Sequence, residues 1–122
     1  MNDNLREYIK NIINALKEAA KEVITLDDGD IMKNVSNFRI VLFNIKDNLI
    51  PEALKLCPEG EYEPEHILKK TERNLWAMDF TILNRIRVTQ NTSEEELDYL
   101  QKWIKRYTSD LEFILDENNR RA

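Results

Sequence analysis

The side chains best suited to chemistry in this chain are its single histidine and its single cysteine, His66 and Cys57. His66 stands three residues after Glu63, which is the Glu-x-x-His spacing of carboxylate-bridged di-iron sites. Such a site needs a second Glu-x-x-His motif, and there is no second histidine to supply it. A zinc site would need two carboxylates to join His66 and Cys57. The sequence therefore predicts no metal and no cofactor.

A cysteine–histidine nucleophile pair is the remaining catalytic option by residue count. Cys57 and His66 flank an irregular connection, residues 58–63, which would position them poorly. The chain also has no glycine-rich phosphate loop and no nucleophile elbow. We therefore predict no catalytic residue and expect a protein that is not an enzyme, with Cys57 a small, partly buried side chain near a helix end.

One motif resembles a known family. His66-Ile67-Leu68-Lys69-Lys70 is similar to the His-x-Leu-Lys-Gly signature of histidine phosphotransfer domains, with Lys70 in place of the glycine. Those domains are four-helix bundles of about this length that pass a phosphoryl group to and from receiver domains. The resemblance implies that His66 is the phosphorylated residue and that Lys69 balances the phosphate charge. A signalling module is thus one alternative function.

The elements that position these residues are predicted to be helices. The chain has 122 residues, of which 42% are apolar and 34% charged, and only two are glycine. This length fits one domain with its own core, over residues 1–122. The scarcity of glycine disfavours a sheet with tight turns, and the high charged fraction suits long amphipathic helices. The composition therefore predicts a single all-α domain.

Apolar residues recur at three- and four-residue steps along most of the chain, which predicts helices with one buried face. We expect four long helices and one short helix, over residues 3–24, 31–49, 51–57, 64–88 and 93–116.

The ends of these helices are marked by individual residues. Asp3 is the expected N-cap of the first helix, and Pro51 suits the first turn of the short one. Ser93 and Glu96 form a capping box at the start of the last helix. We expect residues 117–122 to fray. Short connections between long helices favour an antiparallel up-and-down bundle.

Two of these helices carry more apolar residues than one buried face needs. Trp76, Phe80 and Leu83 form a second stripe beside the core stripe of their helix, and Ile40 and Phe43 point away from the core side of theirs. Aromatic residues are enriched at interface centres. The predicted interface comprises Ile40, Phe43, Trp76, Asp79, Phe80 and Leu83.

Two points about this surface stay open at the level of sequence. Asp79, at the border between the stripes, could pair with an arginine of a partner or remain a solvated carboxylate at the rim. The alternative to an interface is a wide core, in which residues 51–61 cover the second stripes.

The charge of the chain disfavours nucleic acid as the main partner. The net charge is −5, whereas duplex-binding proteins usually show a clear positive footprint. A local basic cluster keeps nucleic-acid contact as a further alternative. This cluster consists of Arg85, Arg87, Lys102, Lys105 and Arg106.

The leading prediction is a non-catalytic interaction or assembly subunit that works through a helical apolar surface. Its partner would be another protein or a second copy in a homodimer, as in a small subunit of a larger complex or a virus-encoded inhibitor. No apolar run approaches the roughly 20 residues of a membrane span, and the first residues do not resemble a signal peptide. We therefore expect no membrane partner and a cytoplasmic (intracellular) location.

Overall fold

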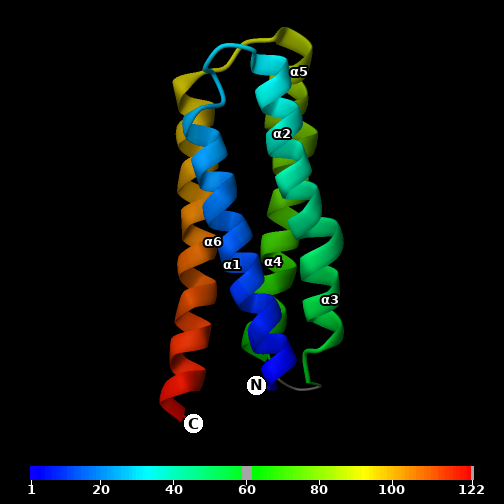
Figure 1. Cartoon of the computed structure of the whole chain (residues 1–122), viewed down its shortest axis with the longest axis vertical. Coiled ribbons are helices and arrows are strands. Elements are labelled where there is room, and N and C mark those ends of the chain that lie inside the picture. The colour runs from blue at the N-terminus through cyan, green and yellow to red at the C-terminus, as the bar shows by residue number, and fades with distance from the viewer. Residues whose placement is uncertain (59–61, 122) are drawn as a thin grey trace.

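Four long helical stretches run alternately up and down the long axis of the computed structural model (Figure 1). The structure describes residues 1–58 and 62–121, and there is no strand among them. The prediction of an all-α antiparallel bundle is therefore confirmed. Residues 59–61, within the predicted irregular connection, and residue 122 lie outside the described residues.

The first stretch is α1, Asp3–Ile24, with the bounds that the sequence predicted. Its N-cap is Asn2, whose backbone is extended and whose side-chain oxygen accepts a hydrogen bond from the Leu5 N–H at 2.7 Å. The prediction that Asp3 caps this helix is wrong, because Asp3 already lies in the first turn. There its carboxylate complements the positive end of the helix dipole.

The second stretch is continuous where a break was predicted. It consists of α2, Ile31–Phe43, then η1, Asn44–Leu49, and then α3, Ile50–Lys55. The segment η1 is a π-helix, in which hydrogen bonds reach one residue further along the chain, as from the Ile50 N–H to the Ile45 carbonyl. A proline inside an α-helix presses on the carbonyl four residues before it. The π turn changes the placement of those carbonyls, so Pro51 follows without interrupting the helix.

The third stretch also contains a π turn. It runs through α4, Tyr62–Met78, then η2, Asp79–Leu83, and then α5, Asn84–Thr89. It ends at Gln90, which adopts a left-handed φ of 57° and donates its N–H to the Ile86 carbonyl. A left-handed residue at this position is a common way to end a helix.

The last stretch is α6, Glu94–Arg121. The predicted capping box is present, because the Glu96 N–H donates to the Ser93 hydroxyl oxygen at 3.2 Å and that hydroxyl donates to the Glu96 carboxylate at 2.8 Å. The helix extends beyond the predicted end at residue 116, as far as Arg121. Fraying of residues 117–122 stays a prediction.

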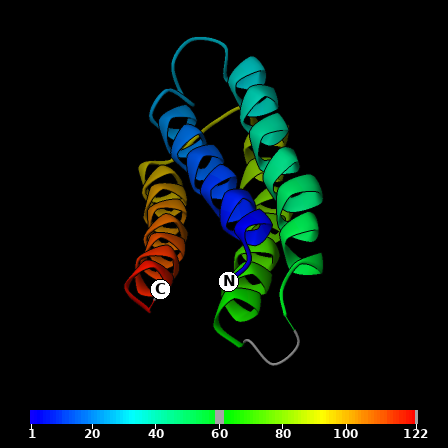
Figure 2. The ribbon, with the colours of Figure 1, turned by 60° about the horizontal axis from the view of Figure 1, so that its bottom comes forward.

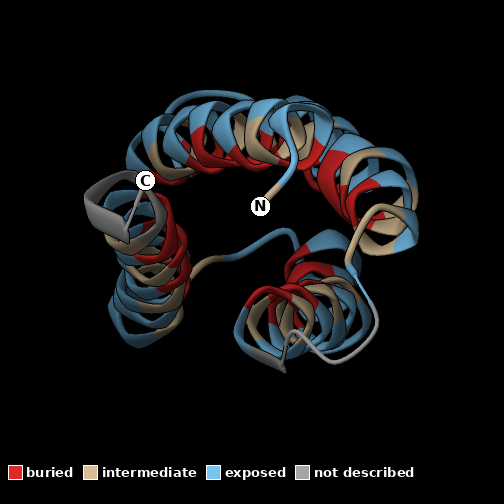
Figure 3. Ribbon diagram, turned by 90° about the horizontal axis from the view of Figure 1, so that it is seen from below, coloured by how far each residue is buried: buried red, intermediate tan, exposed pale blue. Residues whose placement is uncertain are grey.

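The core lies along the inner side of all four stretches, where the buried residues gather (Figure 3). The helix α1 packs against α6 on one side and against α2, η1 and α3 on the other (Figures 1 and 2). The helix α4 packs against α3, η1 and α6. None of the described helices combines the length and the apolar composition that crossing a bilayer requires.

The two π turns lie along the same contact between stretches. The segment η1 packs against α4, and η2 packs against α2. This contact, which we call the seam, runs between the second and third stretches. It positions the residues that the sequence singled out as a second apolar stripe.

Candidate protein-interaction site

The outer side of the seam brings together five of the six residues predicted to form an interface. Ile40 and Phe43 come from α2, Trp76 from α4, and Asp79 and Phe80 from η2. Two cationic residues of the second stretch, Arg39 and Lys46, join them. We call this surface the seam face, and its members are Arg39, Ile40, Phe43, Lys46, Trp76, Asp79 and Phe80.

The apolar members of the seam face are exposed. The exposed fraction is 71% for Phe80, 67% for Ile40, 56% for Phe43 and 37% for Trp76. A wide core covered by residues 51–61 was the alternative to an interface. The helix α3, which holds the first part of that segment, packs against α1 and α4. The wide-core alternative is therefore wrong for Ile40, Phe43 and Phe80.

Leu83 is the predicted interface residue that does not belong to this surface. It is fully buried in the core, whereas ideal α-helical spacing puts it on the same side as Trp76, seven residues earlier. The reason is η2, since a π turn takes about one more residue per turn than an α turn. Residues from the end of the π turn onward are rotated relative to those before it, and this rotation carries Leu83, the last residue of η2, inward.

Lys46 fixes the aromatic part of the seam face from beneath. Its side chain is 4% exposed, and its Nζ lies 3.3 Å from the centre of the Trp76 ring and 5.5 Å from that of Phe43. The same amine pairs with the Asp47 carboxylate at 3.3 Å. A buried ammonium needs such partners, and a cation over an aromatic face is attracted to it. The Trp76 and Phe80 rings stack in turn, with centroids 5.9 Å apart.

The sequence pointed to the aromatic residues of this surface but not to Lys46. The available signal was its spacing, three residues after Phe43, which puts both side chains on neighbouring positions of one helix surface. Its position over Trp76 depends on the packing of a second helix. That packing could not be inferred from the local sequence.

Asp79 is bound within the chain. The Arg39 Nε donates to Asp79 Oδ1 at 2.7 Å and the Arg39 Nη2 to Asp79 Oδ2 at 3.4 Å. The Asp79 side chain is 14% exposed and that of Arg39 46%. Asp79 is thus neither a solvated rim carboxylate nor open to an arginine from a partner, and the exposed member of the pair is the guanidinium.

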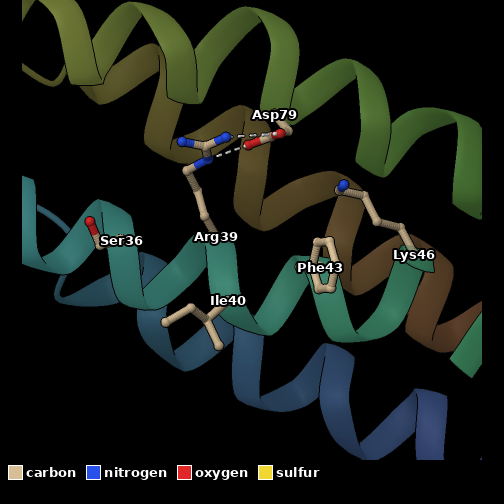
Figure 4. A pocket seen from close by; sticks show the side chains of 6 residues that line it. All are labelled: Ser36, Arg39, Ile40, Phe43, Lys46 and Asp79. Atoms are coloured by element: carbon tan, nitrogen blue, oxygen red, sulfur yellow. Dashed lines mark hydrogen bonds and ion pairs between the residues drawn. The ribbon is translucent and has the colours of Figure 1, made fainter. Parts of the chain in front are cut away.

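A hollow of about 360 Å³ lies on the outer side of the seam, next to the Arg39–Asp79 pair (Figure 4). Ile40 and Phe43 form its apolar walls, and Arg39, Asp79, Lys46 and Ser36 contribute its polar groups. The hollow therefore offers apolar contact beside oriented N–H donors.

The residues of the phosphotransfer motif lie on another side of the bundle. His66 is exposed, and because α4 starts at Tyr62 it lies inside a helix and not at its start. It borders a second hollow of about 320 Å³ between α4 and α6, which Glu63, Ile67, Asp110, Phe113 and Ile114 also line.

The charges around His66 are unlike those the phosphotransfer function needs. The Lys69 amine donates to the Glu65 carboxylate at 2.6 Å, and this hydrogen bond raises the pKa of Lys69. Two carboxylates, Glu63 and Asp110, border the same hollow and would repel a phosphoryl group. The phosphotransfer function stays a prediction.

Most members of the basic cluster have local partners. Arg85 binds the Glu96 carboxylate with two nitrogens, and its Nη2 also donates to the Asn91 carbonyl. This bond raises the pKa of Arg85 and lowers that of Glu96. Among the others, Arg87 donates to Asn84, Arg106 pairs with Asp110, and the Lys102 amine lies 5.5 Å from the Trp103 ring centre. Lys105 is exposed on α6. Nucleic-acid contact stays a prediction.

No group of three histidine, cysteine, aspartate or glutamate side chains that could hold a metal ion occurs in residues 1–58 and 62–121. Cys57 is half-buried after the end of α3, and its thiol lies 3.5 Å from the Ala53 carbonyl oxygen.

Comparison of the chain with protein-family models, with curated proteins and with solved structures finds no match. The seam face is the feature of the described residues that best indicates a function.

Proposed function

We propose that the protein is a non-catalytic interaction subunit that binds another protein through the seam face. The observation that carries this proposal is the exposure of Ile40, Phe43 and Phe80 on two adjacent helical stretches. Full burial of each such side chain is worth about 1.5–3 kcal/mol. Neighbouring apolar groups of this size mark interaction surfaces when they lie together.

The support beneath these side chains also suits binding. Trp76 is stacked on Phe80 and covers the Lys46 amine, and Arg39 is held by two hydrogen bonds to Asp79. Side chains that are already ordered lose less conformational freedom when a partner binds. The partner is a different protein or a second copy of this chain. A different protein would be either another subunit of the same complex or a target that this chain inhibits.

A photocrosslinking experiment tests this proposal in cells that naturally make the protein. Benzoylphenylalanine in place of Phe80 should give one discrete covalent adduct, and Ile40→Asp in the same chain should abolish it. The matched control is benzoylphenylalanine in place of Phe113, an aromatic residue of α6 that is 60% exposed. The mass of the adduct distinguishes a second copy from another protein.

Two results would contradict the proposal. One is the same adducts from positions 80 and 113, which would mean that contact is unspecific. The other is an absence of adducts from position 80 although the chain is folded, as its helical circular dichroism would show.

A further inference from the structure

The hollow of the seam face lies between α2 with η1 on one side and Asp79 of η2 on the other, and we call it the groove; Trp76 and Phe80 lie outside its lining. Ile40 and Phe43 are three residues apart on α2, and Trp76 and Phe80 are four residues apart on α4 and η2. Each pair therefore follows one side of its helix over about one turn. A helix laid between two antiparallel neighbours contacts both through residues at three- and four-residue steps. An occupant of two to three turns would reach all four apolar side chains.

The polar side of this groove presents donors. Arg39 uses Nε and Nη2 to hold Asp79, and its Nη1 bonds to no described residue. In Figure 4 this nitrogen points away from Asp79. A guanidinium carries five N–H donors in a planar fork and can bind a carboxylate along each of two edges. Asp79 occupies one edge and fixes its orientation, so the other edge is already oriented for a second carboxylate.

The charges around the groove favour an acidic occupant. Lys33 and Arg73 are exposed and flank it, and neither forms an ion pair within the described part of the chain. They lie seven residues before Ile40 and Phe80, respectively, which puts them two turns away along the same helix sides. The carboxylates nearby are less exposed, since Asp79 is 14% exposed and Asp47 23%, and Glu72, four residues before Trp76, is half-buried.

A second copy is a poorer occupant than a separate acidic helix. Two copies that pair through the same surface would bring Arg39, Lys33 and Arg73 of both copies into one interface. Like charges brought together at an interface oppose binding. An occupant with a carboxylate beside its apolar residues has no such conflict.

We propose that the seam face binds an amphipathic helix of a partner protein in which an Asp or Glu lies one turn from apolar anchors. The carboxylate pairs with the open edge of Arg39, and the anchors pack on Ile40, Phe43 and Phe80. This inference rests on the proposed interaction function and adds the chemistry of the partner to it.

A displayed library of amphipathic helical peptides with randomised exposed positions tests this partner chemistry directly. Selection on the full chain should enrich apolar residues at three- and four-residue steps together with Asp or Glu. For a synthetic peptide made from an enriched sequence, Arg39→Gln should weaken binding about ten-fold, because a charge-assisted hydrogen bond is lost. Replacing the acidic residue of the peptide by its amide should weaken binding similarly, and the two losses should not add.

The chain offers a matched control in Arg106→Gln. Arg106 also pairs with a carboxylate, that of Asp110, but on α6. Its replacement should leave peptide binding unchanged. Phe80→Glu should abolish binding, and helical circular dichroism of each variant shows that it is folded.

Several outcomes would overturn the inference, and they separate it from the proposed function. Enriched peptides without acidic preference, or equal affinity for Arg39→Gln, would reject the carboxylate while leaving the seam face as an interaction surface. Enriched basic peptides would reject it too. Peptides that still bind Phe80→Glu, or no enrichment at all, would reject helix binding at the seam, and the crosslinks from position 80 then decide whether the proposed function survives.

Discussion

Two rows of aromatic side chains with the same helical spacing lie on different sides of the bundle. In the seam face, Trp76 and Phe80 are four residues apart and their ring centroids are 5.9 Å apart. On α6, Tyr99, Trp103 and Tyr107 follow at the same spacing, with centroids 6.2 and 6.0 Å apart. The exposed fraction rises along the first row, from 37% to 71%. It falls along the second, from 48% for Tyr99 to 1% for Tyr107.

The difference comes from what each row meets on the neighbouring helix. The ring of Tyr107 lies in the core, and its hydroxyl is bound by the Asn74 side chain of α4. Phe80 lies near the start of the π turn η2 and is left outside, whereas Leu83 at the end of the same turn points to the core. An aromatic row at helical spacing is therefore a surface or a core element depending on its neighbour.

The largest expected effect separates the two rows by stability. Tyr107→Ala should lower the free energy of unfolding by about 3–5 kcal/mol, because it leaves a cavity and removes the partner of Asn74. Phe80→Ala should change that free energy by no more than about 0.5 kcal/mol, as is usual for an exposed residue. Urea unfolding followed by circular dichroism measures both.

Equal costs for these two variants would contradict the comparison. A large loss for Phe80→Ala would mean that this ring is packed in the folded chain. The seam face would then lose the residue on which its proposed role most depends.

A second variant tests whether Leu83 belongs to the core and not to the seam face. Leu83→Ala should cost about 2–5 kcal/mol in urea unfolding, because a fully buried side chain is removed. The matched control is Ile40→Ala, which removes a side chain that is 67% exposed and should cost little. A cost for Leu83→Ala no greater than that of Ile40→Ala would mean that η2 does not rotate Leu83 into the core.

Much of the fold could be predicted from local sequence because helix periodicity and caps are local. The apolar steps placed the four long stretches, and Ser93 with Glu96 placed the start of α6. The π turns were missed, since no residue in them signals that the hydrogen bonds shift by one residue. The continuity past Pro51 and the burial of Leu83 both follow from these turns.

The candidate site was predictable only in part, because only its local features can be inferred from the sequence of each helix. Ile40, Phe43, Trp76 and Phe80 stood out because each lies off the core stripe of its own helix. Arg39, the partner of Asp79, is 40 residues away on another stretch, and Trp76, the ring over which Lys46 lies, is also on another stretch than Lys46. Such pairings depend on how the stretches are placed side by side, which the periodicity of each helix leaves undetermined.

The link between Tyr107 and Asn74 should be visible in alkaline solution. Burial raises the pKa of Tyr107, while the hydrogen bond from Asn74 opposes the rise. Because an unfolded tyrosine ionises near pH 10, the unfolded state loses its proton first. The contribution of Tyr107 to stability is therefore present below about pH 10 and is lost as the pH rises toward the higher pKa of the folded state.

Two variants check this dependence by urea unfolding at a series of alkaline pH values. Tyr107→Phe should cost about 0.5–1.5 kcal/mol at neutral pH, where the hydrogen bond is lost, and should remove part of the alkaline decline. Asn74→Ala should steepen the decline, because the opposing hydrogen bond is gone. An alkaline decline that is identical in all three proteins would show that Tyr107 does not contribute to it.

The smallest expected effect concerns the ion pair of the seam face. A double-mutant cycle with Arg39→Gln and Asp79→Asn should give a coupling of about 0.2–1 kcal/mol, since Arg39 is half-exposed and water screens the pair. The Arg106–Asp110 pair on α6, with side chains 65% and 26% exposed, is the matched comparison and should couple by about 0.3–0.5 kcal/mol.

The salt dependence of the coupling and the stability cost of each single variant test the same ion pair further. Added salt should weaken both couplings, and less so for Arg39 with Asp79, because Asp79 is the more buried carboxylate. Arg39→Gln should cost more than Asp79→Asn, because the first leaves a poorly solvated carboxylate and the second leaves an exposed guanidinium. A coupling near zero would mean that Asp79 does not hold the guanidinium. Arg39 would then have no fixed edge to offer a second carboxylate, and the selective recognition of acidic helices would lose its structural basis.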